Sequence, residues 1–210
     1  WLELEGDAPT GGSNALPIAG NIEESSEENT LFNGTVPAAS DADGTIAGYT
    51  LQETVSIGQL TFNSDGSYQF NPGNAFDDLA VGETRIVSFT YVAIDNNNAE
   101  RLPATVSLSI TGTNDLPLVM DSSVMTSENV VFDGSVAGTD VDGSVSSYSL
   151  VTNVLEGELV FNSDGSYQFN PGTAFDDLAV GETREVRFSY VATDNNDGVS
   201  APAEVVLQVE

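Results

Sequence analysis

The sequence of 210 residues contains no cysteine, no histidine and no lysine. Without cysteine, no disulfide can staple the fold, and a bound metal ion is the usual substitute in a small domain. The three absences also exclude zinc sites of the Cys/His kind, histidine-dependent nucleophiles and Schiff-base chemistry. The oxygen-rich side chains that remain suit a hard cation, Ca²⁺ before Mg²⁺.

Basic side chains are also scarce. Four arginines oppose 33 acidic residues, which gives a formal net charge of −29. Nucleic acids and anionic membranes are therefore excluded as partners, because both require a basic patch. A charge of this size repels itself and opposes compaction. Since 40% of the residues are hydrophobic and patterned, neutralisation by cations explains the composition better than disorder does.

No apolar run is long enough to cross a membrane, so we expect no membrane insertion. The chain shows no signal-peptide pattern and opens on Trp1 rather than Met, which indicates a fragment of something longer. Residues 1–20 carry little pattern. We expect them to be a leader or linker, the tail of a preceding repeat, or an added segment.

What the chain does contain is a long internal repeat. Residues 61–97 return almost unchanged as residues 160–196, a shift of 99 positions. A period of about 100 residues is the size of a whole small domain rather than of a solenoid turn. The expected order is a leader over 1–20, one repeat over 21–111, a linker over 112–117 and a second repeat over 118–210. Because the linker is short and ends in proline, it should be stiff.

Hydrophobic patterning predicts an all-β chain. Residues 85–93 alternate, with Phe89 and Tyr91 on the core face. The positions at which the two copies differ there lie on the opposite face, which marks that face as solvent-exposed. Asp65-Gly66 supplies a tight hairpin turn. About seven strands per copy point to two tandem immunoglobulin- or cadherin-like β-sandwich domains. A single helical turn is expected over residues 75–79.

Acidic and amide side chains recur in four short motifs. They are an Asp-x-Asp-Gly loop (Asp41/Asp43 and Asp140/Asp142), the linker pair Asn114-Asp115, the acidic end of a core strand (Asp95 and Asp194), and Glu28 just before the first expected strand. Alternate aspartates in a turn can aim two carboxylates at one point, and glycine permits the sharp bend of a calcium loop. Each motif alone is also an ordinary turn. Because loops from several strands gather at each end of a sandwich, the four together favour a metal site over plain turns.

The combined motifs resemble VCBS-type and cadherin-like repeats, the extender modules of giant bacterial RTX-type adhesins. The likeness covers about residues 21–210 and is carried by Gly-Thr-Asn-Asp-Leu-Pro after a terminal strand, the Asp-x-Asp-Gly loop, Asn-Ser-Asp-Gly-Ser-Tyr-Gln-Phe and a Phe-x-Tyr-x-Ala-x-Asp strand. The resemblance implies a secreted module of the bacterial cell surface, without catalysis, joined end to end with neighbouring repeats of the same chain. Calcium would bind at the junctions. We expect a monomer, with any surface polysaccharide bound by other domains.

Cadherin likeness also implies how the ligands divide. The implied set at the central junction is Glu28 from the upstream module, Asn114 and Asp115 from the linker, and Asp140, Asp142 and Asp194 from the downstream module. The corresponding downstream set at the leading edge of the first copy is Asp41, Asp43 and Asp95. There the linker reads Asn14-Ala15 rather than Asn-Asp, so we expect that site to be weaker or absent. Glu128 would face a third module.

Two other classes of function remain as alternatives. A calcium-dependent carbohydrate-binding sandwich would need an exposed aromatic platform beside a calcium site. Most aromatic residues fall on core parity, while Tyr49 and Tyr148 stay undecided. An enzyme would have to use a carboxylate pair such as Asp77-Asp78, as in glycoside hydrolysis. Since two acids beside a helical turn are more often a cap or a solvated face, we expect no enzyme.

Overall fold

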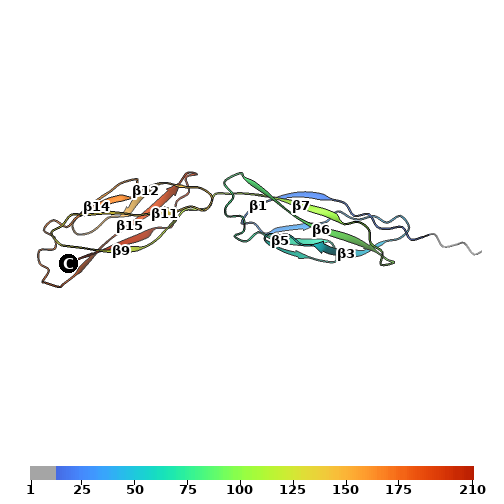
Figure 1. Ribbon diagram of the computed structural model, residues 1–210, viewed down its shortest axis with the longest axis horizontal. Coiled ribbons are helices and arrows are strands. Elements are labelled where there is room, and N and C mark those ends of the chain that lie inside the picture. The colour runs from blue at the N-terminus through green and yellow to red at the C-terminus, as the bar shows by residue number, and fades with distance from the viewer. Residues whose placement is uncertain (1–12) are drawn as a thin grey trace, which may run out of the picture. The chain divides into compact units, whose positions relative to one another are not determined.

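The computed structural model describes residues 13–210 and separates the chain into two compact units, Trp1–Gly112 (unit 1) and Thr113–Glu210 (unit 2). Most of the expected leader, residues 1–12, lies outside the described residues. The described part is all-β, and in each unit the strands run along the length of the unit (Figure 1). None of the described residues belongs to a helix long and apolar enough to cross a membrane.

Unit 1 is a sandwich of two sheets. The larger sheet has the order β1 (Ile22–Glu27), β7 (Ala104–Thr111), β6 (Thr84–Asp95) and β3 (Ile46–Glu53). The smaller sheet has the order β2 (Phe32–Thr35), β5 (Ser67–Asn71) and β4 (Gln59–Phe62). All neighbouring strands are antiparallel except β1 and β7, which are parallel. Strands β1 and β2 are therefore edge strands of different sheets.

Unit 2 repeats this plan. Its larger sheet has the order β12 (Val145–Thr152), β15 (Arg184–Asp194), β16 (Ala203–Val209) and β9 (Ser122–Thr126), and its smaller sheet β10 (Phe132–Ser135), β14 (Ser166–Asn170) and β13 (Glu158–Phe161). Unit 2 has one additional pair, β8 (Leu118–Val119) with β11 (Gly138–Thr139). In unit 1 this pair is reduced to a single bridge between Ile18 and Ser40.

The core lies between the two sheets, as the alternation predicts. Along β6, Val87, Phe89 and Tyr91 are almost completely buried. The ring of Phe89 meets Tyr68 of the opposite sheet edge-on at 5.0 Å, and unit 2 repeats this contact. The predicted hairpin is confirmed, with Gly66 at φ +85° between β4 and β5, a conformation that favours glycine.

Two local predictions were wrong. Residues 75–79 form successive turns rather than a helical turn, with the N–H of Leu79 donating to the carbonyl of Phe76 at 2.9 Å. So short a segment does not offset the cost of helix nucleation. The first strand was also missed. Strand β1 contains only one apolar residue, and its hydrogen bonds go to β7, which is distant in sequence. Glu28 therefore follows the first strand instead of preceding it.

Candidate metal centre

The Asp-x-Asp-Gly loop of unit 2 is held in place by Asn195, which follows strand β15. The side-chain oxygen of Asn195 accepts a hydrogen bond from the N–H of Ser144 at 2.6 Å, and the Asn195 N–H donates to the Ser144 carbonyl at 3.0 Å. Gly143 leaves room for this contact, because a Cβ there would collide with the Asn195 oxygen and lie 3.1 Å from Asp140 Oδ2. The loop is thus fixed against the end of the strand that carries Asp194.

Sequence reasoning did not assign a role to Asn195. The signal was present in the repeat, since Asn96 in unit 1 accepts a hydrogen bond from the N–H of Thr45 at 2.7 Å in the same way. Both asparagines directly follow the acidic residue that ends the long core strand. They position the loop, whereas the loop carboxylates remain available.

Asp194 organises the neighbouring loop. Its Oδ1 accepts hydrogen bonds from the N–H groups of Asn196 at 2.7 Å and Gly198 at 2.8 Å. Its Oδ2 accepts one from the side-chain amide of Asn114 at 2.9 Å. The Asn114 amide and these two backbone donors hold the pKa of Asp194 below its usual range. Asp194 is 1% exposed and therefore stays charged inside the protein surface.

Asp140 and Asp142 present buried oxygens with nothing to bind. Both carboxylate oxygens of each residue are buried and lack a hydrogen-bond partner among the described residues. Burial raises the pKa of Asp140, the neighbouring Asp142 carboxyl raises it further, and the charge of Asp194 adds to the effect. Buried carboxylate oxygens almost always have a hydrogen-bond donor or a cation as partner. Leaving one without a partner costs on the order of several kcal/mol. The arrangement is the donor chemistry that a hard cation requires.

The linker supplies a further oxygen to the same unit. While the Asn114 amide nitrogen donates to Asp194, its Oδ1 is buried and accepts no hydrogen bond from the described residues. Asp115, the next residue, is half-buried. Across the described residues, no three acidic side chains converge tightly enough to hold a metal ion by themselves. The leading end of unit 2 therefore offers two carboxylates and an amide oxygen rather than a closed cage.

The leading end of unit 1 differs in its hydrogen bonds. Both oxygens of Asp43 accept from the N–H of Ala15 at 3.0 Å, so the backbone fills this carboxylate's acceptor sites. The oxygen of Asn14 accepts from the side chain of Asn97, and its amide donates to Asp95 at 2.6 Å. Among the expected ligands at this end, only Asp41 keeps both oxygens buried and without a partner.

The trailing ends of the units carry one glutamate each. The N–H of Glu28 donates to the carbonyl of Thr111 at 2.9 Å, so Glu28 sits beside the last residue of β7. In unit 2 the N–H of Glu128 donates to the carbonyl of Glu210 at 2.8 Å, at the end of the last strand. Each glutamate therefore lies where its unit's chain leaves the sandwich.

Neither a carboxylate-pair enzyme site nor a calcium-dependent sugar site with an aromatic platform gains support from the described residues. Arg85 binds Asp78 at 2.8 Å and holds the pKa of Asp78 low, the opposite of what a general acid needs. No aromatic side chain appears among the exposed large hydrophobic residues of the described part. Tyr49 is half-buried, with its hydroxyl accepting from the N–H of Ala39 at 3.0 Å, and Tyr148 is bound alike. An aromatic platform for sugar stacking is thus absent from residues 13–210.

Comparison with known proteins gives a consistent family. The sequence profile described as "Bacterial cadherin-like domain" matches residues 7–112 and again residues 114–210. The crystal structure of Protocadherin Gamma C5 EC1–3 is similar with a TM-score of 0.54 at 14% identity, covering 93% of this chain and 68% of that one. Extracellular cadherin domains 1–4 of Protocadherin Gamma B7 give 0.48 at 17% identity, covering 93% of this chain and 51% of that chain.

Drosophila N-cadherin EC1–4 gives a TM-score of 0.40 at 16% identity, with 94% of this chain and 51% of that chain covered. This chain therefore spans about half the length of two of these three structures. No curated protein sequence matches the chain. At identities this low, the structural likeness concerns the fold alone.

Proposed function

The chain belongs to the bacterial cadherin-like domain family, and from this premise we propose that it is a non-catalytic extender segment of a large bacterial surface adhesin, stiffened by Ca²⁺ bound where its two units join. Cadherin-like domains are extracellular structural and adhesion modules, and cadherin-like homologues generally bind Ca²⁺.

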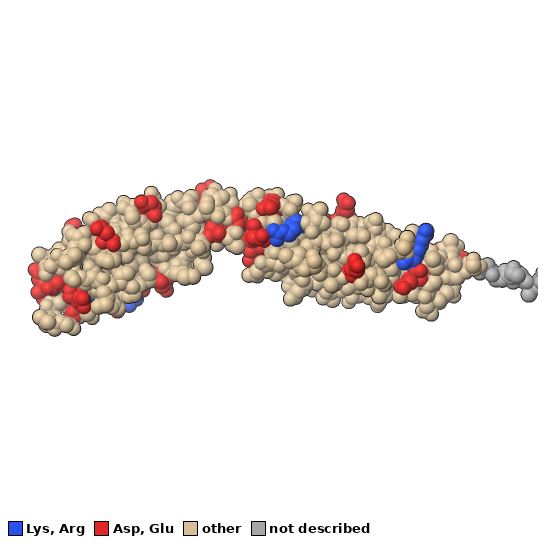
Figure 2. Space-filling view, viewed as in Figure 1, with Lys and Arg blue, Asp and Glu red and all other residues tan. Residues whose placement is uncertain are grey.

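The proposal rests on the buried carboxylate oxygens of the Asp-x-Asp-Gly loop in unit 2. Asp140 and Asp142 together bury four carboxylate oxygens that no described residue contacts by a hydrogen bond. A polar group in that state is destabilising unless a cation or a donor compensates it. The chain has no lysine and only four arginines, and Figure 2 shows acidic side chains spread over both units with few basic ones between them. A cation from solution is the compensation that the composition favours.

The proposed ligands at the leading end of unit 2 have different roles in binding the ion. Asp140 and Asp142 supply the charged oxygens, and Asn114 adds its amide oxygen. Asp194 is oriented in advance by its three hydrogen-bond donors and supplies a further negative charge. These are hard oxygen ligands, and Ca²⁺ is coordinated by about six to eight of them. When bound, the ion supplies only charge and coordination, with no chemical step.

The linker residues Asn114 and Asp115 closely follow the last strand of unit 1. Asn114 and Asp115 follow Thr111 by three and four residues, and Glu28 sits beside Thr111 through a backbone hydrogen bond. Glu28 therefore lies beside the last strand residue before the linker, and the proposal includes it in the ligand set on that ground. Glu128 has the same relation to the end of unit 2 and would serve a following repeat.

The expected energy is large for a small domain. Extracellular modules of this kind bind calcium with a Kd of about 10⁻⁴ to 10⁻³ M. At a hundredfold excess over Kd, one site adds about 2.7 kcal/mol to the folded state. A small domain has a total stability of about 5–15 kcal/mol. Calcium would therefore supply a substantial share of the stability of the unit that binds it.

Chelation is the first test. Removing calcium with EDTA should lower the melting temperature, because the ion no longer neutralises the clustered carboxylates. Small-angle scattering should then report a wider range of orientations between the units, because the ion no longer links them. Magnesium at the same concentration serves as the control for ionic strength. Equal melting curves and equal scattering with calcium and with chelator would reject the proposal.

Substitution tests the ligand assignment separately. Asp140→Ala and Asp142→Ala together should abolish the calcium-dependent change in scattering while both sandwiches stay folded. Asp41→Ala is the matched control, since Asp41 occupies the corresponding position of unit 1. A calcium response that survives the double substitution would exclude these two residues as ligands.

A further inference from the structure

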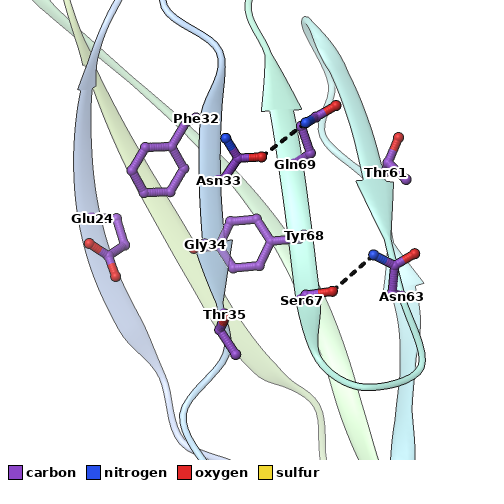
Figure 3. A pocket seen from close by; sticks show the side chains of 10 residues that line it. All are labelled: Glu24, Phe32, Asn33, Gly34, Thr35, Thr61, Asn63, Ser67, Tyr68 and Gln69. Carbon is purple, nitrogen blue, oxygen red and sulfur yellow. Dashed lines mark hydrogen bonds between the residues drawn. The ribbon is translucent and has the colours of Figure 1, made fainter.

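Unit 1 carries an open groove of about 840 Å³ beside the edge strands β1 and β2 (Figure 3). Strand β1 contributes Glu24 to it, β2 contributes Phe32, and β5 contributes Tyr68. None of these residues belongs to the calcium ligands proposed above. The groove lies along the middle of β1, where Glu24 is opposite Leu108 of β7, and not at either end of the unit.

Tyr68 brings an unsatisfied hydroxyl to this groove. Its ring passes directly inside Gly34, where a Cβ would collide with the ring, and Figure 3 shows it pointing from β5 past β2 toward Glu24. The residue is 2% exposed, and its hydroxyl is buried without a hydrogen-bond partner among the described residues. Burial, with a contribution from Glu24, raises the pKa of Tyr68 to about 12. The hydroxyl therefore keeps its proton and is a donor without an acceptor.

Glu24 is the complementary unsatisfied group. It is half-buried on the inward face of β1 and forms no hydrogen bond or ion pair with any described residue. The corresponding position in unit 2 is Val124, which packs against the core opposite Leu207. The fold therefore accepts an apolar residue here, and unit 1 has a carboxylate instead. This carboxylate faces the groove and is available to a hydrogen-bond donor there.

The two groups together define what could fill the groove. The occupant must accept a hydrogen bond from the Tyr68 hydroxyl and donate one to the Glu24 carboxylate. A hydroxyl group does both, an ammonium group only donates, and an anion would be repelled by Glu24. No lysine or arginine lines the groove, so nothing there would neutralise an anionic ligand.

The rim of the groove has the same neutral hydrogen-bonding character. The side-chain amide of Gln69 donates to Asn33 at 2.9 Å, and that of Asn63 donates to Ser67 at 2.9 Å. These two pairs, drawn as dashed lines in Figure 3, leave amide groups free to meet further hydroxyls. The half-buried ring of Phe32 offers an apolar surface beside them. Amides, one carboxylate and an aromatic edge suit a polyhydroxylated neutral ligand.

We propose that the Glu24–Tyr68 groove of unit 1 binds a neutral saccharide, with a sugar hydroxyl bridging the two side chains, without the participation of calcium. The volume lies within the range of about 300–1,000 Å³ that is usual for small-ligand sites. A single water could bridge the same two groups, but it would leave the rim unused. The site would let this segment hold a neutral polysaccharide directly, in addition to any adhesive domain elsewhere.

Unit 2 is a built-in comparison. Its corresponding groove is only about 260 Å³, and Asp133 and Val160 replace the neutral polar residues Asn33 and Thr61. Because Val124 stands where unit 1 has Glu24, Tyr167 has no counterpart of the Glu24 carboxylate and should not take part in binding. The proposal therefore places the activity in one of two nearly identical domains.

Affinity electrophoresis of the two-unit chain in native gels tests this directly. The gels contain dextran, mannan or galactan as neutral polysaccharides and alginate as the anionic one, each with calcium and with EDTA. The expected result is retardation by at least one neutral polysaccharide, unchanged by EDTA, and none by alginate. Glu24→Val and Tyr68→Phe should each weaken it at least tenfold, while Tyr167→Phe should leave it unchanged.

Melting curves separate a binding role from a structural one. Tyr68→Phe removes a buried hydroxyl without a partner and keeps the ring, so it should leave the melting temperature equal or higher while binding falls. Glu24→Val introduces the residue that unit 2 already has and should also stay folded. Retardation by none of the three neutral polysaccharides, by alginate alone, or equally in both variants would overturn the proposal. Loss of retardation in EDTA would do the same and would instead favour a calcium-linked site.

Discussion

Replacing Asp142 by asparagine should change the stability of unit 2 in opposite directions with and without calcium. Asp142 is 8% exposed, both its oxygens lack a partner, and its charge acts on Asp140. Without calcium these carboxylates only repel each other. With calcium they become ligands, so the same charge becomes favourable. The substitution removes one charge and keeps the shape of the side chain.

The magnitude follows from the two states. Two like charges about 4 Å apart repel by about 1 kcal/mol in water and about 4 kcal/mol at an effective dielectric constant of 20. In EDTA, Asp142→Asn should therefore raise the free energy of unfolding by about 1 kcal/mol or more. In saturating calcium, loss of one site should lower it by up to about 2.7 kcal/mol. For a domain of this size, that loss corresponds to a fall in melting temperature of about 10–20 °C.

The assay is thermal unfolding of the two-unit chain in 10 mM calcium and in EDTA, with hydrogen exchange to assign each transition to its unit. Asp43→Asn is the matched control in unit 1, where the N–H of Ala15 already binds both carboxylate oxygens. That variant should gain nothing in EDTA. If Asp142→Asn lowered stability by the same amount in both solutions, the carboxylate would have a structural role and the reasoning would be refuted.

Three further outcomes test the fold itself. Gly112→Ala should destabilise unit 1 by about 1–3 kcal/mol, because its Cβ would lie 2.5 Å from two backbone oxygens, whereas Gly20→Ala, with 3.6 Å of room, should be nearly neutral in urea unfolding. Phe89→Ala should cost about 3–5 kcal/mol, because the ring is 1% exposed, and in EDTA hydrogen exchange in unit 2 should stay unchanged. Asp65→Ala should lower the urea midpoint at pH 7 but have no effect at strongly acidic pH. The Ser67 hydroxyl and N–H hold the pKa of Asp65 low, so the stabilisation is present above the unfolded pKa and is lost as pH falls through the folded one.

The sandwich could be predicted because the alternation of apolar and polar residues shows which face of each core strand is buried. Strand β6 alternates apolar and polar residues, and the repeat shows which of its positions are free to vary. Strand β1 could not be found in this way. It reads as a mostly polar segment, and only its parallel pairing with β7, about 80 residues away, makes it a strand.

The candidate site was predictable in composition but not in detail. Alternate aspartates and a linker asparagine indicate a hard-cation site from their chemistry alone. Which oxygens remain available depends on hydrogen bonds that the sequence does not display, such as that from Ala15 to Asp43 in unit 1. Glu24 was not noticed, because an inward-facing carboxylate can be recognised only once the strand and its direction are known.

Distances between the two units provide the most direct test of calcium-dependent stiffness. The chain has no native cysteine, so Gln52→Cys and Val151→Cys, both at exposed positions, allow one spin label on each unit. The account predicts a narrow distribution of label distances in calcium, a broad one in EDTA, and a broad one in both solutions once Asp140 and Asp142 are replaced. Distributions of equal width in calcium and in EDTA for the otherwise unchanged chain would contradict it.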